Sequence, residues 1–221
     1  MKKILLTGLC LAVFATGARA QSSINDRVNA AVNILGAKQN SPKPIPRKII
    51  DDAKGIAIIN IGQGGFIFGG RHGEGIVITR TRGALGPSWS VPIAFSMSGG
   101  SFGAQIGYQT VSCVFVLNSD EAVRNFLSGT EVKWDAAAQG TVGPEHIAEG
   151  NDAATAAAVY IYTQTGGVYG GATIGGTTLR TDNKLNTAAY PDLSLSDLIA
   201  GKGTRPREAA KLYELLNGPA E

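Results

Sequence analysis

Two histidines, His72 and His146, are the first residues to consider for metal or acid–base chemistry. Neither has a second histidine or a cysteine at the spacing of a helical metal site. The motif Glu145-His146-x-x-Glu149 could hold a metal, but it sits among glycines and exposed acids. The carboxylates of Asp51-Asp52 stand on adjacent residues, which point to different faces of a helix. Because no convergent set of groups is visible, the sequence favours a protein with no catalytic activity, cofactor or metal.

Clusters of glycine, Gly62-Gln-Gly-Gly65 and Gly69-Gly70, could in principle cradle a phosphate. They fail the tests for such loops, since no G-x-x-x-x-G-K-[ST] occurs and no G-x-G-x-x-G opens a helix. More strand-forming sequence follows them instead. The glycines therefore indicate turns, bulges or a close approach of two backbones rather than a nucleotide site.

Basic side chains crowd one short segment, which holds Lys38, Lys43, Arg47 and Lys48, with Lys54 shortly after. This segment has two interpretations. It could be an ordinary solvated face, or it could be a patch for anionic head groups. Each base near a charged lipid surface contributes about 1 kcal/mol to binding.

The first twenty residues have the pattern of a secretory signal. Lys2 and Lys3 precede a short apolar run, and Ala18-Arg19-Ala20 matches an A-x-A cleavage site. We expect residues 1–20 to be removed, which leaves one domain at 21–221, secreted across the inner membrane and periplasmic or extracellular. The chain has 20 Lys and Arg against 17 Asp and Glu, and three of these bases lie in the leader. The processed chain is then formally neutral, which argues against nucleic acid as a partner.

Cys113 is the cysteine that remains after this cleavage, because Cys10 lies in the leader. An intramolecular disulfide is therefore excluded in the processed chain. Valine and phenylalanine surround the thiol in Val111-Ser-Cys-Val-Phe-Val116, which predicts a buried structural cysteine rather than a nucleophile.

Strands must make up most of the scaffold. Between Gly55 and Leu117, short runs of β-branched and aromatic residues alternate with Gly, Pro, Asn or Ser, which is typical of strands and turns. The gaps are too short for helical crossovers, so we expect antiparallel pairing. The predicted strands are Ile56–Ile61, Ile76–Thr81, Trp89–Met97 and Val111–Leu117, followed by Val132–Trp134, Ala153–Gln164, Val168–Ile174 and Thr177–Asp182.

Helices are predicted at both ends of the chain. Ser23 can cap the first, with Asp26 in the capping-box position, and Gly36 ends it. Its apolar face predicts packing on the core, with membrane contact as the alternative, and Arg27 falls largely on the opposite, polar face. Further helices are predicted at Arg47–Lys54, Ser119–Leu127, Ser196–Ala200 and Pro206–Leu216. The fold class is α+β, a single domain whose Gly-rich antiparallel sheet is flanked by short terminal helices. The sequence leaves open whether the sheet closes into a barrel.

A series of motifs runs through nearly all of the processed chain. In order they are Ile45-Pro46, Ala53-Lys-Gly-Ile-Ala57, the block Gly62–Gly75, Trp89-Ser-x-Pro92, Gly103-x-Gln-Ile-Gly107, Gly140–Pro144, Tyr162-Thr-Gln-Thr-Gly-Gly167, Leu198-Ile-Ala-Gly201 and Leu212-Tyr-Glu-Leu-Leu216. In this combination the chain resembles a SYLF domain, the lipid-binding family of bacterial secreted proteins and of eukaryotic actin and membrane regulators.

The resemblance implies binding of acidic phospholipids without catalysis. In eukaryotic members the ligand is a phosphatidylinositol phosphate, and binding is attributed to the basic N-terminal part. The matching positions here are Lys38, Lys43, Arg47, Lys48 and Lys54. For this chain we expect other anionic phospholipids of a membrane surface and no actin-related activity. The alternative is a structural or protein-interaction module of the cell envelope that does not depend on lipid.

Overall fold

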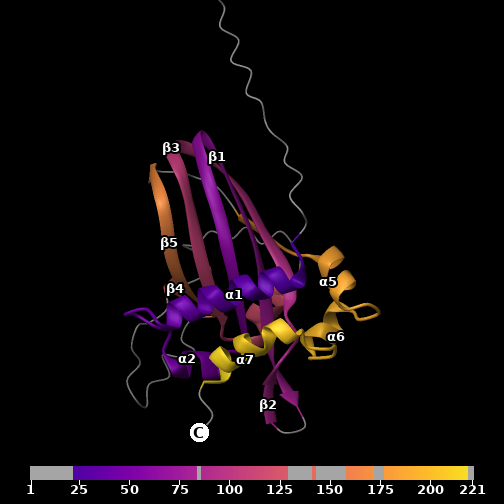
Figure 1. Ribbon diagram of the computed structural model, residues 1–221. Helices are drawn as coiled ribbons and strands as arrows, with labels where there is room; N and C mark the ends of the chain where they lie inside the picture. Colours follow the sequence, from indigo (N-terminus) through magenta and orange to yellow (C-terminus); the bar gives the residue numbers. More distant parts are fainter. Residues whose placement is uncertain (1–21, 84–85, 129–140, 143–157, 172–176, 219–221) are drawn as a thin grey trace, which may run out of the picture.

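The architecture is that of a computed structural model, which describes residues 22–83, 86–128, 141–142, 158–171 and 177–218 (Figure 1). Helices occupy both ends of this chain and strands the middle. The elements in order are α1 (Ile24–Gln39), α2 (Arg47–Asp52), β1 (Gly55–Gly83), β2 (Gly86–Trp89), β3 (Ile93–Leu117), α3 (Asp120–Leu127), β4 (Thr141–Val142), β5 (Val159–Gly171), β6 (Thr177–Thr181), α5 (Asn183–Ala189), α6 (Leu195–Ile199), η2 (Arg207–Ala209) and α7 (Ala210–Asn217).

The strands form one six-stranded sheet in the order β2-β1-β3-β5-β4, with β6 also paired to β3. Pairing is antiparallel except where the two residues of β4 run parallel to β5. Among the described residues no pairing joins β2 to β4, so the sheet is not closed into a barrel. The predicted α+β class with a Gly-rich antiparallel sheet is confirmed.

The strands are longer than the sequence suggested, and the glycine clusters lie inside them. Ile56–Ile61 and Ile76–Thr81 are two parts of β1, which pairs with β3 from Gly55 opposite Leu117 to Val77 opposite Ile93. The prediction of separate short strands was therefore wrong. Glycine still offers its backbone N–H and C=O to the ladder, so a partner strand keeps it in register even where its intrinsic preference is poor.

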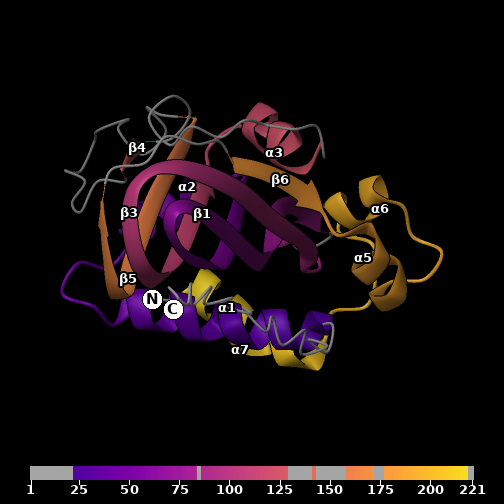
Figure 2. The same cartoon turned by 90° about the horizontal axis from the view of Figure 1, so that it is seen from above.

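A bend halfway along folds β1 back on itself, and Figures 1 and 2 show the β1–β3 ribbon arching over at its upper end. The register between the two strands shifts between Phe66 and Phe68. Beyond this bulge the second half of β1 lies against the first. A Cβ built on Gly75 would stand 2.2 Å from the carbonyl oxygen of Ile58, which leaves room for glycine alone. The close backbone approach predicted for the glycines is thus confirmed here.

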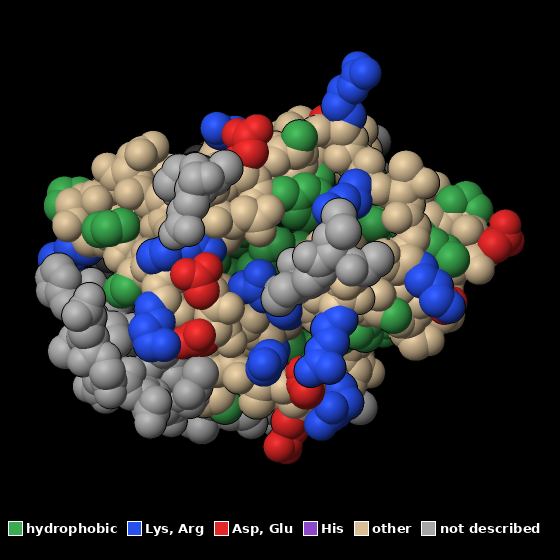
Figure 3. All heavy atoms as spheres, turned by 90° about the horizontal axis from the view of Figure 1, so that it is seen from below, with side chains coloured by type: hydrophobic (Ala, Val, Ile, Leu, Met, Phe, Trp, Pro, Cys, Tyr) green, Lys and Arg blue, Asp and Glu red, His purple; other side chains and the backbone are tan. Residues whose placement is uncertain are grey.

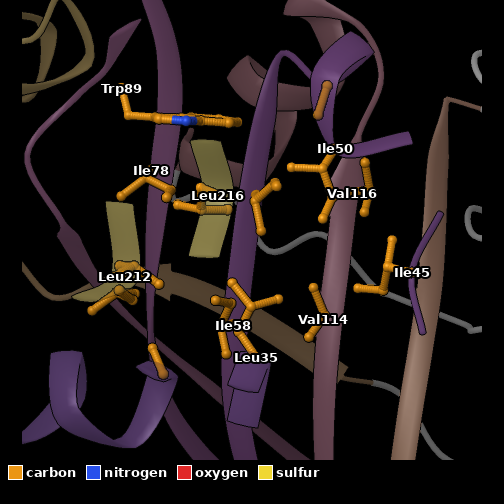
Figure 4. Packing of buried hydrophobic residues seen from close by; sticks show 14 of the residues in the cluster. Leu35, Ile45, Ile50, Ile58, Ile78, Trp89, Val114, Val116, Leu212 and Leu216 are labelled. Carbon is orange, nitrogen blue, oxygen red and sulfur yellow. The ribbon is translucent and has the colours of Figure 1, made fainter. Parts of the chain in front are cut away.

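Side chains on the two faces of the sheet pack into two separate hydrophobic cores, because successive side chains of a strand point to opposite faces. The first core packs on α1, α2 and α7, and Figure 4 shows Trp89 and Ile78 meeting Leu216 there. The second packs on α3, where the rings of Phe95 and Phe126 meet edge to face with centroids 5.0 Å apart. Figure 2 shows α1 and α7 along one side of the sheet and α3 on the other. The sheet is therefore the middle layer of three.

The helix signals were mostly correct, with shifted ends. Ser23 and Asp26 form the predicted capping box of α1, but the helix continues past Gly36 to Gln39. Gly36 faces α7, where a Cβ would lie 3.8 Å from Cδ1 of Leu215, so packing holds the helix through the glycine. α2 ends at Asp52 rather than Lys54, and Ser119 caps α3 as predicted. α5, capped by Asp182, was not predicted.

Some sequence features fall outside the described residues: the predicted leader at residues 1–20, the strand predicted at Val132–Trp134 and the motif Glu145-His146-x-x-Glu149. The first part of the strand predicted at Ala153–Gln164 and the end of that at Val168–Ile174 also lie outside them. Among the helices that the structure describes, none combines the length and the apolar composition needed to cross a bilayer.

Candidate functional site

The five bases singled out from the sequence lie at one end of the molecule, and we call them the basic corner. Lys38 is in the last turn of α1, Lys43 in the following loop, Arg47 and Lys48 in the first turn of α2, and Lys54 between α2 and β1. Figure 3 views the end of the fold that carries α2, α7 and β2, where Lys and Arg side chains gather with acidic ones between them.

Two of these bases are engaged with the acids of their own helix. Arg47 pairs with Asp51 one turn on, and the ammonium of Lys48 lies 2.9 Å from a carboxylate oxygen of Asp52. Both pairs are partly exposed, so each contributes roughly 0–1 kcal/mol to stability. Asp51-Asp52 therefore serves as a pair of counter-charges. Five bases against two acids leave the corner positive.

Arg47 has a structural task as well. Its guanidinium donates hydrogen bonds to the main-chain carbonyls of Leu215 and Leu216 near the end of α7, and so ties α2 to that helix. Carbonyls of a last helical turn lack intrahelical partners and carry the negative end of the helix dipole, which a guanidinium satisfies. These hydrogen bonds hold the Arg47 guanidinium in place, so it is little available to a ligand.

Arg80 also lies at this end of the molecule, although it stands outside the basic segment of the sequence. Its guanidinium carbon stands 3.7 Å from the centroid of the Trp89 ring, its cross-strand neighbour, and it donates to the carbonyls of Ile50 and Asp51 at the end of α2. Burial lowers the pKa of Arg80, and the nearby charge of Asp51 opposes that shift. By stacking on Trp89 and bonding to the end of α2, Arg80 holds that helix against the sheet. In the sequence, an Arg and a Trp placed to face each other across a β-hairpin could have predicted this stacked pair.

Arg27, in contrast, is not part of any exposed basic surface. It was predicted to fall on the polar face of α1, but it is only 5% exposed. Its guanidinium lies 2.7 Å from the carboxylate of Asp182 and 3.5 Å from that of Glu74, and it donates to the carbonyl of Phe95. The spacing explains the error, because Arg27 stands four residues before the buried Ala31 and shares its face.

Figure 1 shows β1 and β3 continuing above α1, beyond the part of the sheet that this helix covers. Residues of this upper half and of the start of α1 line a polar cleft. Along β1 every second residue stays on this face, so the buried Ile56 and Ile58 are followed by Asn60, Gly62 and Gly64. The cleft measures about 870 Å³, and we call it the glycine cleft. Its lining consists of Ser22, Asp26, Arg27, Ala30, Asn60, Gly62, Gly64, Gly70, Arg71, His72, Gly73, Glu74, Tyr108 and Thr110.

Polar contacts already organise one wall of the glycine cleft. The Ser22 hydroxyl donates to Glu74 Oε2 at 2.6 Å, and His72 Nε2 lies 3.9 Å from Glu74 Oε1. Opposite, Tyr108 is 62% exposed, and its ring lies over the bare backbone of the neighbouring strand. The glycines that resembled phosphate loops therefore form a strip of bare backbone along β1, on both sides of its bend and beside an exposed ring.

The remaining candidates for chemistry are inert or outside the described residues. Cys113 is buried, as predicted, and burial raises the pKa of its thiol to about 12, which keeps it protonated and unreactive at neutral pH. No group of three or more His, Cys, Asp or Glu side chains placed to hold a metal occurs in the part of the chain that the structure describes.

Comparison with known proteins relates the chain to a known family. Residues 98–218 match the family model Ysc84, described as "Las17-binding protein actin regulator". The chain is 34% identical over 209 residues to human SH3 domain-containing YSC84-like protein 1. This alignment covers 90% of this chain and 60% of the relative. It is 31% identical over 194 residues to Protein YSC84 of Saccharomyces cerevisiae. That alignment covers 85% of this chain and 40% of the relative. No solved structure matches the chain.

The chain is a member of the Ysc84, or SYLF, family. The resemblance drawn from the motifs is confirmed. The chain spans about 60% of the length of the human relative and 40% of the yeast one, so these relatives are considerably longer proteins.

Proposed function

We propose that this domain binds anionic phospholipid surfaces through the basic corner and catalyses no reaction. The observation that carries the proposal is the gathering of five bases, from the end of α1 to the start of β1, at one end of the fold. Membership of a family described by binding and regulation supports a binding role. Other anionic lipids than phosphatidylinositol phosphates are the expected ligands.

The expected affinity for an anionic membrane depends on how many of the basic side chains can approach its surface. Arg47 is held against α7 by its hydrogen bonds, whereas the side chains of Lys43, Lys48 and Lys54 are exposed. Three lysines contribute about 3 kcal/mol in total at about 1 kcal/mol each. Binding should therefore be weak. It should also fall with added salt, since the Debye length is only about 10 Å at 0.1 M.

The test is co-sedimentation of the protein with vesicles of phosphatidylcholine, with and without phosphatidylserine, at low and moderate salt. The variant Lys43→Glu/Lys48→Glu/Lys54→Glu leaves Arg47 and its structural bonds intact. It should lower binding to the anionic vesicles at least hundredfold, the equivalent of about 3 kcal/mol.

The matched control reverses three exposed bases on α3, β6 and α5, in Arg124→Glu/Arg180→Glu/Lys184→Glu. It changes the net charge by the same amount away from the basic corner and should retain nearly all of the binding. Equal losses in both variants would mean that net charge alone, and not the corner, attracts the protein. Anionic binding that is unchanged in the corner variant would refute the proposed surface.

A second candidate function is protein binding. The family description names a Las17-binding protein, and a Saccharomyces cerevisiae relative, 29% identical over 192 residues, is named LAS seventeen-binding protein 3. A module of this kind in a cell envelope would bind neither type of vesicle. The same sedimentation experiment therefore separates the two functions.

Secretion is a further part of the proposal. It rests on the basic start at Lys2-Lys3 and the cleavage pattern Ala18-Arg19-Ala20. The intact mass of the protein purified from its native source should correspond to a chain that begins at Gln21. A mass that includes the first twenty residues would refute cleavage at this site.

A further inference from the structure

One glycine of the cleft has no explanation in the fold itself. Gly73 and Gly75 allow the two halves of β1 to touch, and Gly62 and Gly64 lie under Tyr108. At Gly70, however, an added Cβ would meet no described atom within 4 Å, and the residue does not adopt a positive φ. Glycine weakens a strand, and inside one it often marks a place where a ligand approaches the backbone closely.

The ring beside this strip is the second observation. Tyr108 projects from β3 into the cleft and remains 62% exposed, although large aromatic side chains are usually covered. Its hydroxyl would lie 3.1 Å from a Cβ on Gly62, so the ring spans the neighbouring strand. The exposed face of the Tyr108 ring can stack on one face of a ligand. The glycines beside it have no side chains, so the ligand can also approach the backbone of β1.

The charges of the cleft argue against a strongly ionic ligand. Its lining holds two bases, Arg27 and Arg71, and two acids, Asp26 and Glu74. Arg27 is engaged with Asp182, Phe95 and Ser22 outside or at the margin of the cleft. The other lining groups are hydrogen-bonding but formally uncharged, namely an amide, an imidazole and hydroxyls. The cleft thus offers donors and acceptors in balance.

These observations together indicate a neutral polyhydroxylated ring. We propose that the glycine cleft binds a neutral saccharide, with one face of a sugar ring on Tyr108, its edge against the bare backbone at Gly70, and its hydroxyls bonded by Asn60, Thr110 and Glu74. A volume of about 870 Å³ admits a short oligosaccharide, since small-molecule sites span roughly 300–1,000 Å³.

This site is separate from the basic corner and goes beyond the lipid-binding function. It uses α1 as far as Ala30, whereas the corner begins at Lys38, eight residues or about 12 Å further along the helix axis. The two sites can therefore be disabled independently.

The test is a ¹H–¹⁵N NMR titration of the labelled protein with triacetylchitotriose and with maltotriose, beside inorganic phosphate and phosphocholine. At least one saccharide should shift the amide signals around Gly70 and Tyr108 at millimolar concentration, while phosphate and phosphocholine should not. The corner variant Lys43→Glu/Lys48→Glu/Lys54→Glu should give the same saccharide titration as the wild type.

Three variants test the geometry. Gly70→Val should keep the melting temperature, because a Cβ at this position meets no described atom within 4 Å, yet weaken saccharide binding at least tenfold. Tyr108→Ala should weaken it about tenfold by loss of the ring, whereas Tyr108→Phe should stay within about threefold. Thr163→Val, at an exposed position of β5 outside the cleft, is the matched control and should change nothing.

Several results would overturn the proposal. Absence of cleft shifts with both saccharides would do so, as would saccharide binding that Gly70→Val leaves unchanged in a folded protein. Cleft shifts produced by phosphate or phosphocholine alone would assign the cleft to a charged ligand instead.

Discussion

Replacing Arg27 by methionine should be among the most damaging single changes in this protein. The guanidinium joins three elements, because it pairs with Asp182 at the cap of α5, pairs with Glu74 of β1 and donates to the Phe95 carbonyl of β3 at 2.9 Å. Methionine retains an unbranched apolar stem of similar reach. The variant therefore removes the charge and its hydrogen bonds while most of the packing around α1 remains.

The size of the effect follows from burial. Removing one partner of a buried ion pair costs about 3–5 kcal/mol, because the remaining charge is left without compensation. The side chain of Arg27 is 4% exposed and that of Asp182 is 19% exposed, so some water can reach the carboxylate. We therefore expect a loss near the lower limit, about 3 kcal/mol. The matched control Lys48→Met breaks the exposed pair with Asp52 and should cost roughly 0–1 kcal/mol.

Urea unfolding followed by circular dichroism measures both values, with an unchanged m-value as the sign that the unfolded state is the same. A double-mutant cycle with Asp182→Asn isolates the pair, and its coupling energy should exceed 1 kcal/mol. If Arg27→Met costs less than about 1 kcal/mol, or no more than Lys48→Met, the assignment of Arg27 as a buried link between α1, β1 and α5 is wrong.

Three further changes test the packing and titration of the core. Gly75→Ala places a Cβ 2.2 Å from the Ile58 carbonyl oxygen, so we expect a loss of about 3 kcal/mol or a protein that does not fold in the same urea assay. Gly36→Ala should instead raise stability by up to about 1 kcal/mol, since the new methyl group meets Leu215 at 3.8 Å inside a helix; a loss would show that α1 does not continue through this residue. The raised pKa of Cys113 predicts stability that is fully present below its ordinary value near 9 and is lost as the pH rises toward about 12. Between about pH 8 and pH 10 the wild type should therefore lose roughly 1 kcal/mol more than Cys113→Ala, and parallel curves would contradict this.

Local signals predicted the helices well because their causes are local. A capping box needs only Ser23 and Asp26, and both of its hydrogen bonds are present. Ser119 caps α3 in the same way. The end of α1 was missed because glycine is a poor helix former in isolation, whereas Gly36 is held by α7, which lies far away in sequence. Packing by a distant element decided that boundary.

The division of the strands at the glycine clusters was wrong for a related reason. A glycine in a turn and a glycine at a contact between two strands look the same in sequence. At Gly75 the requirement comes from the backbone of Ile58, and at Gly73 from that of Asn60. Nothing near these residues in sequence indicates either partner. Between Gly55 and Leu117 the predicted strands were therefore largely placed correctly, but the glycine clusters were wrongly taken to divide them.

The two candidate sites differ in how far a sequence can predict them. The basic corner comes from one contiguous segment, so counting charges found its members, although not the bonds that hold Arg47 against α7. The glycine cleft draws on α1, both halves of β1 and on β3, and it exists only because β1 folds back on itself. Half of its lining lies in the Gly62–Gly75 block, but the sequence does not show that this block shares a face of the sheet with Tyr108 and the start of α1. A site of this kind is defined by the register of β1 on β3, and a shift by one residue would turn Tyr108 to the opposite face.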